Sequence, residues 1–500
     1  MTTATGAGSA LTISIDANLA DGVLAHARTD RDRPALIVPA GAVTYGALAT
    51  RIARFADGLR REGIAPGERI ALTVSDTPSA AIGFFGAALA GIATVPIAPD
   101  MPAAEREALV GELAIVATLG GVDDDAPLRV PRLLARGRTD DPAAMRAPGG
   151  AREATVMLSS GTTGRPKAIA LSHHRQLWFL RAFAAALGTS PGDRYLPVVA
   201  PSFAFGRNPM LRLLDAGGTV IARKIPADVD GLVDLVRASA ATELVLTPSH
   251  VHHLLAAWTG AGPAFPDLRR MIVSTAFLHH AARLQAMRRI SPALHVGLGT
   301  NEVGYVALSG PDDLVRVPDT VGRALPEITI EVVDESGAPM APGAIGELRI
   351  AGPNVGSGYL NAPEASRSAF RAGWFHPGDL ATLDAGGFLH LVGRVDDRIN
   401  QGGIKIYPVE IERVLRAHPA VAEAAAVGLP AVRSGEMVAA AVVLSGSVTI
   451  DELDRWSRER LGAVKSPRRI LAVDALPRNA MGKVPPAELR ALLLDILSRT

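Results

Sequence analysis

The stretch from Val156 to His173 is VMLSSGTTGRPKAIALSH, and the rest of the chain is best understood from it. Apolar residues at 156–158 and 168–171 predict two strands, separated by a loop rich in glycine and hydroxyl groups. Small residues let backbone N–H groups approach an anion, hydroxyl groups add donors, and Lys167 adds a positive charge. The stretch therefore predicts a strand–loop–strand hairpin that binds a polyphosphate.

The loop differs from a P-loop, in which a lysine directly follows glycine and leads into a helix. Here Lys167 follows Gly164 by three residues and comes after Pro166. The alternative is a flexible polar turn, but the length of the ordered string and the motifs downstream favour phosphate binding. The string resembles the signature loop of the adenylate-forming (AMP-binding) superfamily, which includes acyl-CoA synthetases, aryl and fatty acid–CoA ligases, peptide-synthetase adenylation domains and luciferases.

Length and composition set outer limits on the fold and its partners. The 500 residues predict two or more domains, and 48% hydrophobic with 20% charged residues is typical of a globular protein. A net charge of +1 gives no reason to expect nucleic acid or an anionic membrane as partner. The absence of cysteine excludes disulfides and favours a cytoplasmic location. We expect no signal peptide and no membrane span, and leave the oligomeric state open.

Helical and strand patterns alternate through the first half of the chain, which predicts a parallel sheet with helices on its faces. The expected elements are a helix at 53–63, a strand at 69–75, a helix at 80–90, a strand at 94–97, a helix at 176–187 and strands at 243–247 and 271–275.

A second motif, GLGTNEVG, occupies 297–304. It resembles the family pattern aromatic-Gly-x-Thr-Glu, with Leu298 in place of the aromatic residue and Asn301 in place of threonine. The resemblance implies that Glu302 binds Mg²⁺, which prefers carboxylate oxygens. We expect Asn301 to donate to a phosphate through its amide.

Further resemblances complete a nucleotide site. Ser274-Thr275-Ala276 is similar to the turn that lines adenine, Asp379 in Pro-Gly-Asp to the residue that accepts both ribose hydroxyls, and Arg394 to a nucleotide contact. The implied ATP-binding residues are Ser159, Ser160, Gly161, Thr162, Thr163, Gly164, Lys167, Thr275, Ala276, Gly299, Thr300, Asn301, Asp379 and Arg394. Thr163, Lys167, Glu302 and Lys483 are the implied catalytic residues.

Four apolar side chains are candidates for the acid pocket: Phe203, Phe205, Phe277 and Leu298. Many acyl-CoA ligases have Pro-x-Phe-His where this chain has Pro-Ser-Phe-Ala at 201–204. No aspartate stands there to pair with an ammonium group, which weighs against an α-amino acid. The alternative for the two phenylalanines is ordinary core packing.

The run from Asp319 to Glu364 resembles a β-rich stretch found across the family, and we interpret it as structural. After it, 394–397 resembles a hinge with Asp396 as the pivot. The elements expected beyond the hinge are a helix at 410–416, strands at 421–427 and 437–444, a helix at 451–461 and a strand at 469–473.

Two segments of this C-terminal part carry implied roles. Gly402, Gly403 and Lys405 are assigned to the thiol half-reaction, with a solvated strand lysine as the alternative for Lys405. LPRNAMGK at 476–483 resembles the family's final motif, which implies that Lys483 bridges the reacting carboxylate and the α-phosphate.

The resemblance implies an α/β multidomain fold. A large N-terminal domain (1–394) of β/α sheets has a β-rich subdomain, a hinge follows at 395–397, and a small mobile α+β domain spans 398–500. The implied reaction activates an apolar aryl or short- to medium-chain carboxylic acid with ATP and Mg²⁺ and transfers the acyl group to coenzyme A. Three alternatives remain open: loading of an acyl carrier protein, a nucleotide sensor without catalysis, and a luciferase-type oxidation.

Overall fold

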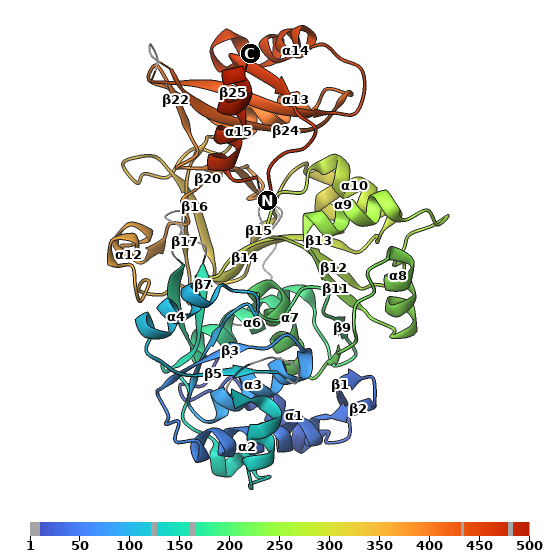
Figure 1. Ribbon diagram of the computed structural model, residues 1–500, viewed down its shortest axis with the longest axis vertical. Coiled ribbons are helices and arrows are strands. Elements are labelled where there is room, and N and C mark those ends of the chain that lie inside the picture. The colour runs from blue at the N-terminus through green and yellow to red at the C-terminus, as the bar shows by residue number, and fades with distance from the viewer. Residues whose placement is uncertain are drawn as a thin grey trace, which may run out of the picture. The chain divides into compact units, whose positions relative to one another are not determined.

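The computed structural model describes residues 11–121, 126, 128–159, 166–431, 435–478 and 484–499. The chain divides into two compact units (Figure 1). The first consists of residues 1–330 and 350–375, and the second of residues 331–349 and 376–500. The division predicted at 394–398 stays a prediction.

The larger sheet of the first unit is mostly parallel. Among the described residues it has nine strands, in the order β15-β14-β13-β12-β11-β9-β10-β1-β2. The strands from β13 to β1 run parallel, whereas β14 and β15 at one end and β2 at the other are antiparallel. The bounds are β1 Pro34–Val38, β2 Gly41–Thr44, β9 Arg194–Leu196, β10 Thr219–Ile221, β11 Glu243–Leu246, β12 Arg270–Val273, β13 Leu294–Thr300, β14 Gly304–Ser309 and β15 Arg323–Ala324.

A second sheet of the first unit contains the hairpin. Its order is β6-β5-β3-β4-β7-β8, with only β8 antiparallel to its neighbour. The bounds are β3 Arg69–Thr73, β4 Ala93–Pro96, β5 Ile115–Gly120, β6 Leu128–Arg129, β7 Glu153–Ser159 and β8 Lys167–Ser172. Strands β3 and β4 are apolar and almost wholly buried, as expected for parallel strands covered on both faces. The predicted parallel sheet and hairpin are confirmed.

Helices connect these strands, and side-chain caps fix several of their starts. Ser172 accepts a hydrogen bond from Arg175 N–H at the start of α6, and Asp76 caps α3 in the same way through Ser79. The bounds are α1 Asp21–Thr29, α2 Tyr45–Arg61, α3 Thr77–Leu89, α4 Ala103–Glu112, α5 Val130–Arg136, α6 His173–Leu187, α7 Ala204–Asp215, α8 Val229–Ala238, α9 Pro248–Ala257, α10 His280–Arg289, α11 Pro311–Arg316 and α12 Pro363–Ala369, with a 3₁₀ turn at Pro142–Met145. The helices predicted at 53–63, 80–90 and 176–187 overlap α2, α3 and α6.

A buried ion network joins α7 to the large sheet. The carboxylate of Glu243 pairs with Arg212 of α7 and accepts a 3.0 Å hydrogen bond from Arg270 Nε. Arg270 also pairs with Asp193 at 2.5 Å, just before β9. Each of these four side chains is at most 4% exposed, and every charge has an opposite charge beside it. The network fixes the amino ends of β11 and β12.

Shorter strands follow β15 in the sequence and precede the C-terminal part. Strand β17 pairs with β19 at Ile350 and with β20 at Glu347, and β20 forms a hairpin with β21. The bounds are β16 Thr329–Val333, β17 Gly346–Ala351, β18 Phe370–Arg371, β19 Trp374–Phe375, β20 Asp379–Leu383 and β21 Leu389–Arg394.

The C-terminal part of the second unit is α+β, as predicted. Its sheet has the order β23-β22-β25-β24, with β26 parallel to β25, and appears in orange and red in Figure 1. The bounds are β22 Ile399–Gln401, β23 Ile404–Ile406, α13 Pro408–Arg416, β24 Val421–Ala431, β25 Gly435–Leu444, α14 Ile450–Lys465, β26 Arg469–Ala472 and α15 Pro486–Arg499. No helix in the described part of the chain has the length and apolar character needed to cross a bilayer.

Candidate functional site

The predicted hairpin places its loop at the carboxyl end of β7. Strands β7 and β8 are antiparallel, with Ser159 opposite Lys167, and the Ser159 hydroxyl donates to the Lys167 carbonyl at 3.4 Å. The predicted loop residues Ser160, Gly161, Thr162, Thr163 and Gly164 lie outside the described residues.

Most of the other predicted site residues of the first unit lie at, or just after, the carboxyl ends of the parallel strands of the large sheet. Strands β9, β11, β12 and β13 are adjacent and parallel, so the segments that follow them meet at one edge (Figure 1). Thr275 and Ala276 follow β12, Gly299 and Thr300 end β13, and Phe203 follows β9. Ligands of open α/β sheets bind at such edges.

Thr275 has a strained backbone at this edge. Its φ is 81°, in the left-handed region that β-branched residues rarely adopt. Its hydroxyl is buried and has no hydrogen-bond partner among the described residues, and the same holds for the hydroxyl of Thr300. Backbone strain of this kind costs about 1–3 kcal/mol and is concentrated at functional sites. Two unsatisfied hydroxyl groups at one edge suit a ligand rich in oxygen atoms.

Glu302 and Lys167 are linked through Tyr359. Glu302 is 8% exposed, and its Oε1 accepts a 3.0 Å hydrogen bond from the Tyr359 hydroxyl. The Lys167 ammonium lies 5.3 Å from the centre of the Tyr359 ring. Glu302 and Lys167, which were both predicted as site residues, therefore lie beside the same tyrosine side chain.

Arg175 holds the backbone on which Glu302 stands. Its guanidinium donates to the Glu302 carbonyl at 3.0 Å, to the Asn354 carbonyl at 2.9 Å and to the Ala170 carbonyl at 2.9 Å. Burial lowers the pKa of Arg175 to about 10, so it remains charged at neutral pH. The Glu302 main chain is therefore fixed to β8.

Two amide side chains tie the hairpin to this cluster. Asn301 Nδ2 donates to the Leu158 carbonyl at 2.8 Å. Asn361 accepts from Ala168 N–H at 2.9 Å and donates to the Pro166 carbonyl at 3.1 Å. The sequence suggested that Asn301 donates to a phosphate, whereas its amide here supports the end of β7.

Tyr359 and Asn361 are residues that sequence analysis missed. Both belong to GYLN at 358–361, inside the run that we had interpreted as purely structural. The available signal was a tyrosine and an asparagine two residues apart in the segment between β17 and α12. Their partners are far away in the sequence, so the contact itself could not be predicted.

The residues present fit a magnesium ion that arrives with a nucleotide. The described residues contain no group of three or more His, Asp or Glu side chains that would hold a metal by themselves. Mg²⁺ is usually held by one or two carboxylates together with substrate phosphates and water. The single carboxylate of Glu302 and the unsatisfied hydroxyl of Thr300 match that donor set.

The predicted acid-pocket residues belong to three segments: the start of α7, the turn after β12, and β13. Phe203 is the N-cap residue of α7 and is 41% exposed, so ordinary core packing does not describe it. Phe205 is half-buried in the first turn. Phe277 packs edge-on against His279, with ring centres 4.6 Å apart, and Leu298 is half-buried in β13.

In the second unit, Asp379 and Arg394 form a 2.7 Å ion pair at opposed positions of β20 and β21. Lys405 forms an ion pair with Glu335. Gly402 and Gly403 have φ of 61° and 87°, which explains glycine in this turn between β22 and β23. Lys483 lies outside the described residues.

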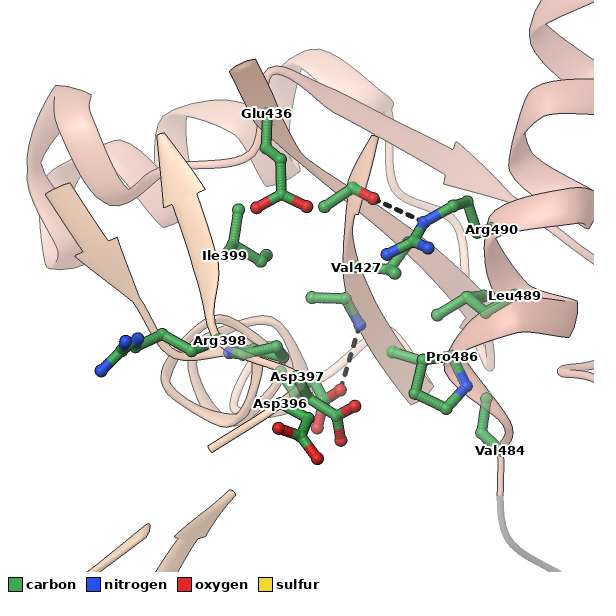
Figure 2. A pocket seen from close by; sticks show the side chains of 15 residues that line it. Asp396, Asp397, Arg398, Ile399, Val427, Glu436, Val484, Pro486, Leu489 and Arg490 are labelled. Atoms are coloured by element: carbon green, nitrogen blue, oxygen red, sulfur yellow. Dashed lines mark hydrogen bonds between the residues drawn. The ribbon is translucent and has the colours of Figure 1, made fainter. Parts of the chain in front are cut away.

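A pocket of about 140 Å³ in the second unit includes the predicted hinge residue Asp396 (Figure 2). Asp397 and Glu412 also line it. Burial raises the pKa of Asp397, and the neighbouring Asp396 adds to the effect. Burial raises the pKa of Glu412, although its carboxylate accepts a 3.0 Å hydrogen bond from Ala426 N–H. Arg398 and Arg490 also line the pocket, so carboxyl and guanidinium groups face it together.

Comparison with protein families gives two matches. The family described as "AMP-binding enzyme" matches residues 23–360, and the "AMP-binding enzyme C-terminal domain" matches residues 410–483. Together they cover both the hairpin and the Glu302 cluster, as well as most of the C-terminal part.

Individual proteins are similar over almost their full length. Feruloyl-CoA synthase from Amycolatopsis sp is 31% identical over 468 residues, which is 90% of this chain and 94% of the relative. 3-hydroxybenzoate–CoA ligase from Aromatoleum sp. (strain CIB) is 30% identical over 497 residues, or 92% and 94%. The crystal structure of ATP-bound MatB from Rhodopseudomonas palustris matches with a TM-score of 0.86 at 26% identity, covering 96% of this chain and 100% of that one.

Proposed function

The chain belongs to the AMP-binding enzyme family, and on this premise we propose that it joins an apolar aryl or short- to medium-chain carboxylic acid to coenzyme A. It is an AMP-forming acid–thiol ligase that uses ATP, Mg²⁺ and coenzyme A. The acid carboxylate attacks the α-phosphorus of ATP, and pyrophosphate leaves. The thiol of coenzyme A then attacks the carbonyl of the acyl-adenylate, and AMP leaves.

The observation that carries this function is the cluster of Lys167, Tyr359 and Glu302 at the end of the hairpin. The first half-reaction brings a carboxylate to a polyanion, so catalysis depends on positioning and on stabilising negative charge. Lys167 supplies positive charge beside the loop, and Glu302 would hold Mg²⁺, which neutralises phosphate charge when bound. The unsatisfied hydroxyls of Thr275 and Thr300 are donors for the nucleotide.

The assignments in the C-terminal part remain proposals that rest on the family motifs. Lys483 bridges the carboxylate and the α-phosphate during adenylation. A mobile domain at 398–500 then turns about Asp396, in the hinge 395–397, relative to a domain at 1–394. That movement withdraws Lys483 and brings Gly402, Gly403 and Lys405 to the thiol reaction.

The relatives support an aromatic or otherwise apolar acid. The two named above are a feruloyl-CoA synthase and a 3-hydroxybenzoate–CoA ligase. Phe203, Phe205, Phe277 and Leu298 would surround such an acid. The absence of cysteine from the sequence supports a cytoplasmic location.

Acid-dependent pyrophosphate release with ATP and Mg²⁺ tests the function, using a panel of aryl and aliphatic acids with and without coenzyme A. Continuous turnover only with coenzyme A is the expected result. Release that stops after about one equivalent despite coenzyme A would instead indicate an acyl carrier protein as the acceptor. No release with any acid would contradict the proposed activity.

A further inference from the structure

Arg207 is a buried cation that the reaction described above leaves unexplained. It is 1% exposed in the first half of α7. Its guanidinium donates to the carbonyls of Pro201 (3.4 Å) and Ser202 (3.3 Å) and to the Met157 sulfur (2.7 Å), and it lies 5.1 Å from the centre of the Phe84 ring. Within the described residues no carboxylate pairs with it, and its Nε has no partner.

A second arginine on the same helix provides the comparison. Arg212 is 2% exposed, and its guanidinium pairs with Glu243 and donates to Thr189. Burial is therefore equal at the two positions, but only Arg212 has a counter-charge. The lack of a counter-charge does not identify a ligand site by itself, since Arg283 is also fully buried and donates to the carbonyls of Leu278 and Thr320.

The surroundings of Arg207 add positive potential. Burial lowers its pKa to about 9, so it is still charged at neutral pH. Its hydrogen bonds to Pro201 and Ser202 show that the side chain points back past the start of α7, where the helix dipole is positive. The N-cap residue Phe203 offers no side-chain cap in the described structure. Two sources of positive potential in a dry location favour an anion.

The position of Arg207 links it to the proposed acid pocket. It follows Phe203, the N-cap residue of α7, by four residues, and Phe203 is 41% exposed. Its partner Met157 precedes Ser159 by two residues on β7, which is about 7 Å along a strand. Arg207 is therefore near Phe203 in the sequence and contacts β7 two residues before Ser159.

We propose that Arg207 binds a second carboxylate of the substrate, at the end remote from the reacting carboxyl group, so that the substrate is a dicarboxylic acid with an apolar body. The inference rests on the proposed ligase activity and names its substrate class. The planar guanidinium accommodates a carboxylate through two parallel hydrogen bonds. The phenylalanine side chains would contact the apolar part between the two carboxylates.

Matched acids test the proposal in the full-length enzyme. Each aliphatic or aromatic dicarboxylic acid is compared with its half methyl ester, which has similar size but one charge less. For the wild type we expect kcat/KM, from pyrophosphate release with coenzyme A, to favour the best diacid over its half ester at least tenfold.

Arg207→Met should lower kcat/KM for the diacid roughly 100-fold and leave kcat/KM for the half ester within a fewfold of the wild-type value. Arg207→Lys should restore part of the diacid preference. Equal use of diacid and half ester by wild type and variant would overturn the proposal.

Thermal unfolding separates a binding role from a structural one. Replacing an unpaired buried cation by methionine removes a desolvation penalty, so Arg207→Met should melt at the same temperature as the wild type or higher. The matched variant Arg212→Met leaves Glu243 with one partner fewer and should melt lower. If Arg207→Met is as destabilised as Arg212→Met, Arg207 is structural and the proposal fails.

A binding measurement keeps the proposal separate from the ligase activity. The free diacid, without ATP, should raise the melting temperature of the wild type more than its half ester does, and this difference should vanish in Arg207→Met. If no acid releases pyrophosphate but this difference is found, the proposed function fails and the anion site stands. If pyrophosphate is released but no diacid-specific shift or preference is found, the function stands and the inference fails.

Discussion

The hydroxyl of Tyr359 donates a 3.0 Å hydrogen bond to one carboxylate oxygen of Glu302. The Glu302 backbone is held separately by Arg175, whose guanidinium donates to the Glu302 carbonyl at 3.0 Å. Side chain and main chain are thus fixed by different partners. A carboxylate held in this way is pre-organised to bind a cation, because little reorganisation is needed when the cation arrives.

Tyr359→Phe should lower kcat/KM for adenylation roughly tenfold, because it removes a hydrogen bond to a charged group and leaves the ring beside Lys167. The Mg²⁺ concentration needed for half-maximal rate should rise. Tyr45→Phe is the control: it removes hydrogen bonds to the carbonyls of Leu214 (3.1 Å) and Gly218 (2.8 Å), and should lower stability without changing the Mg²⁺ requirement. An unchanged Mg²⁺ titration in Tyr359→Phe would contradict the role given to Tyr359.

Asn301→Asp should raise the KM for ATP roughly tenfold. The substitution keeps the shape of the side chain but replaces the donor to the Leu158 carbonyl with a second acceptor. The end of β7, and with it the start of the phosphate-binding loop, then loses a support. Steady-state pyrophosphate release against ATP concentration measures the effect. A variant with the wild-type KM for ATP would show that this hydrogen bond does not position the loop.

Lys483→Ala should nearly abolish adenylation, because the proposed bridge between carboxylate and α-phosphate is lost. Thioester formation from supplied acyl-adenylate and coenzyme A should stay largely intact. Lys465→Ala is a matched lysine control, since Lys465 forms a 2.8 Å ion pair with Glu410 and has no proposed role in the reaction. Equal loss of both half-reactions in Lys483→Ala would refute the assignment.

His173 should make the protein acid-sensitive. Burial lowers its pKa from 6.5 to about 4, and its Nδ1 accepts a 3.0 Å hydrogen bond from Leu19 N–H, which requires the neutral ring. The unfolded chain therefore binds a proton at a higher pH than the folded chain, and stability is lost as pH falls below 6.5. Between pH 7 and pH 5 the loss from this residue is about 2 kcal/mol. Urea unfolding at both pH values should show this difference in wild type and in His174→Asn, and a smaller one in His173→Asn.

Glu412→Gln should stabilise the protein at pH 8 more than at pH 5. Burial raises the pKa of Glu412, so its contribution to stability is fully present below the unfolded pKa and is lost as pH rises through the folded pKa. Glutamine stays neutral at every pH and can still accept from Ala426 N–H. Melting temperatures at the two pH values measure the effect. A variant that is equally stabilised at both, or destabilised at pH 8, would contradict the raised pKa.

Elements that depend on a local sequence pattern could be predicted from the sequence. The hairpin, β3, β4 and the C-terminal elements follow from apolar periodicity and turn residues within short windows, and the structure confirms them. The motif around Glu302 also identified a residue that the structure places in a cluster with Lys167.

Contacts between distant segments could not be predicted in this way. Tyr359 and Glu302 are separated by 57 positions, and Arg207 and Met157 by 50. Neither pair has a periodic signal, because each depends on how two elements pack. The missing counter-charge of Arg207 is visible only when all its neighbours are known.

The left-handed backbone of Thr275 has a consequence for engineering a more heat-resistant ligase. Glycine adopts such a backbone without strain, so Thr275→Gly is a change that a designer seeking stability would choose first. It would also delete one of the two unsatisfied hydroxyls at the sheet edge. Thermostability gained there would be exchanged for nucleotide affinity, so stabilising substitutions are better sought away from this turn.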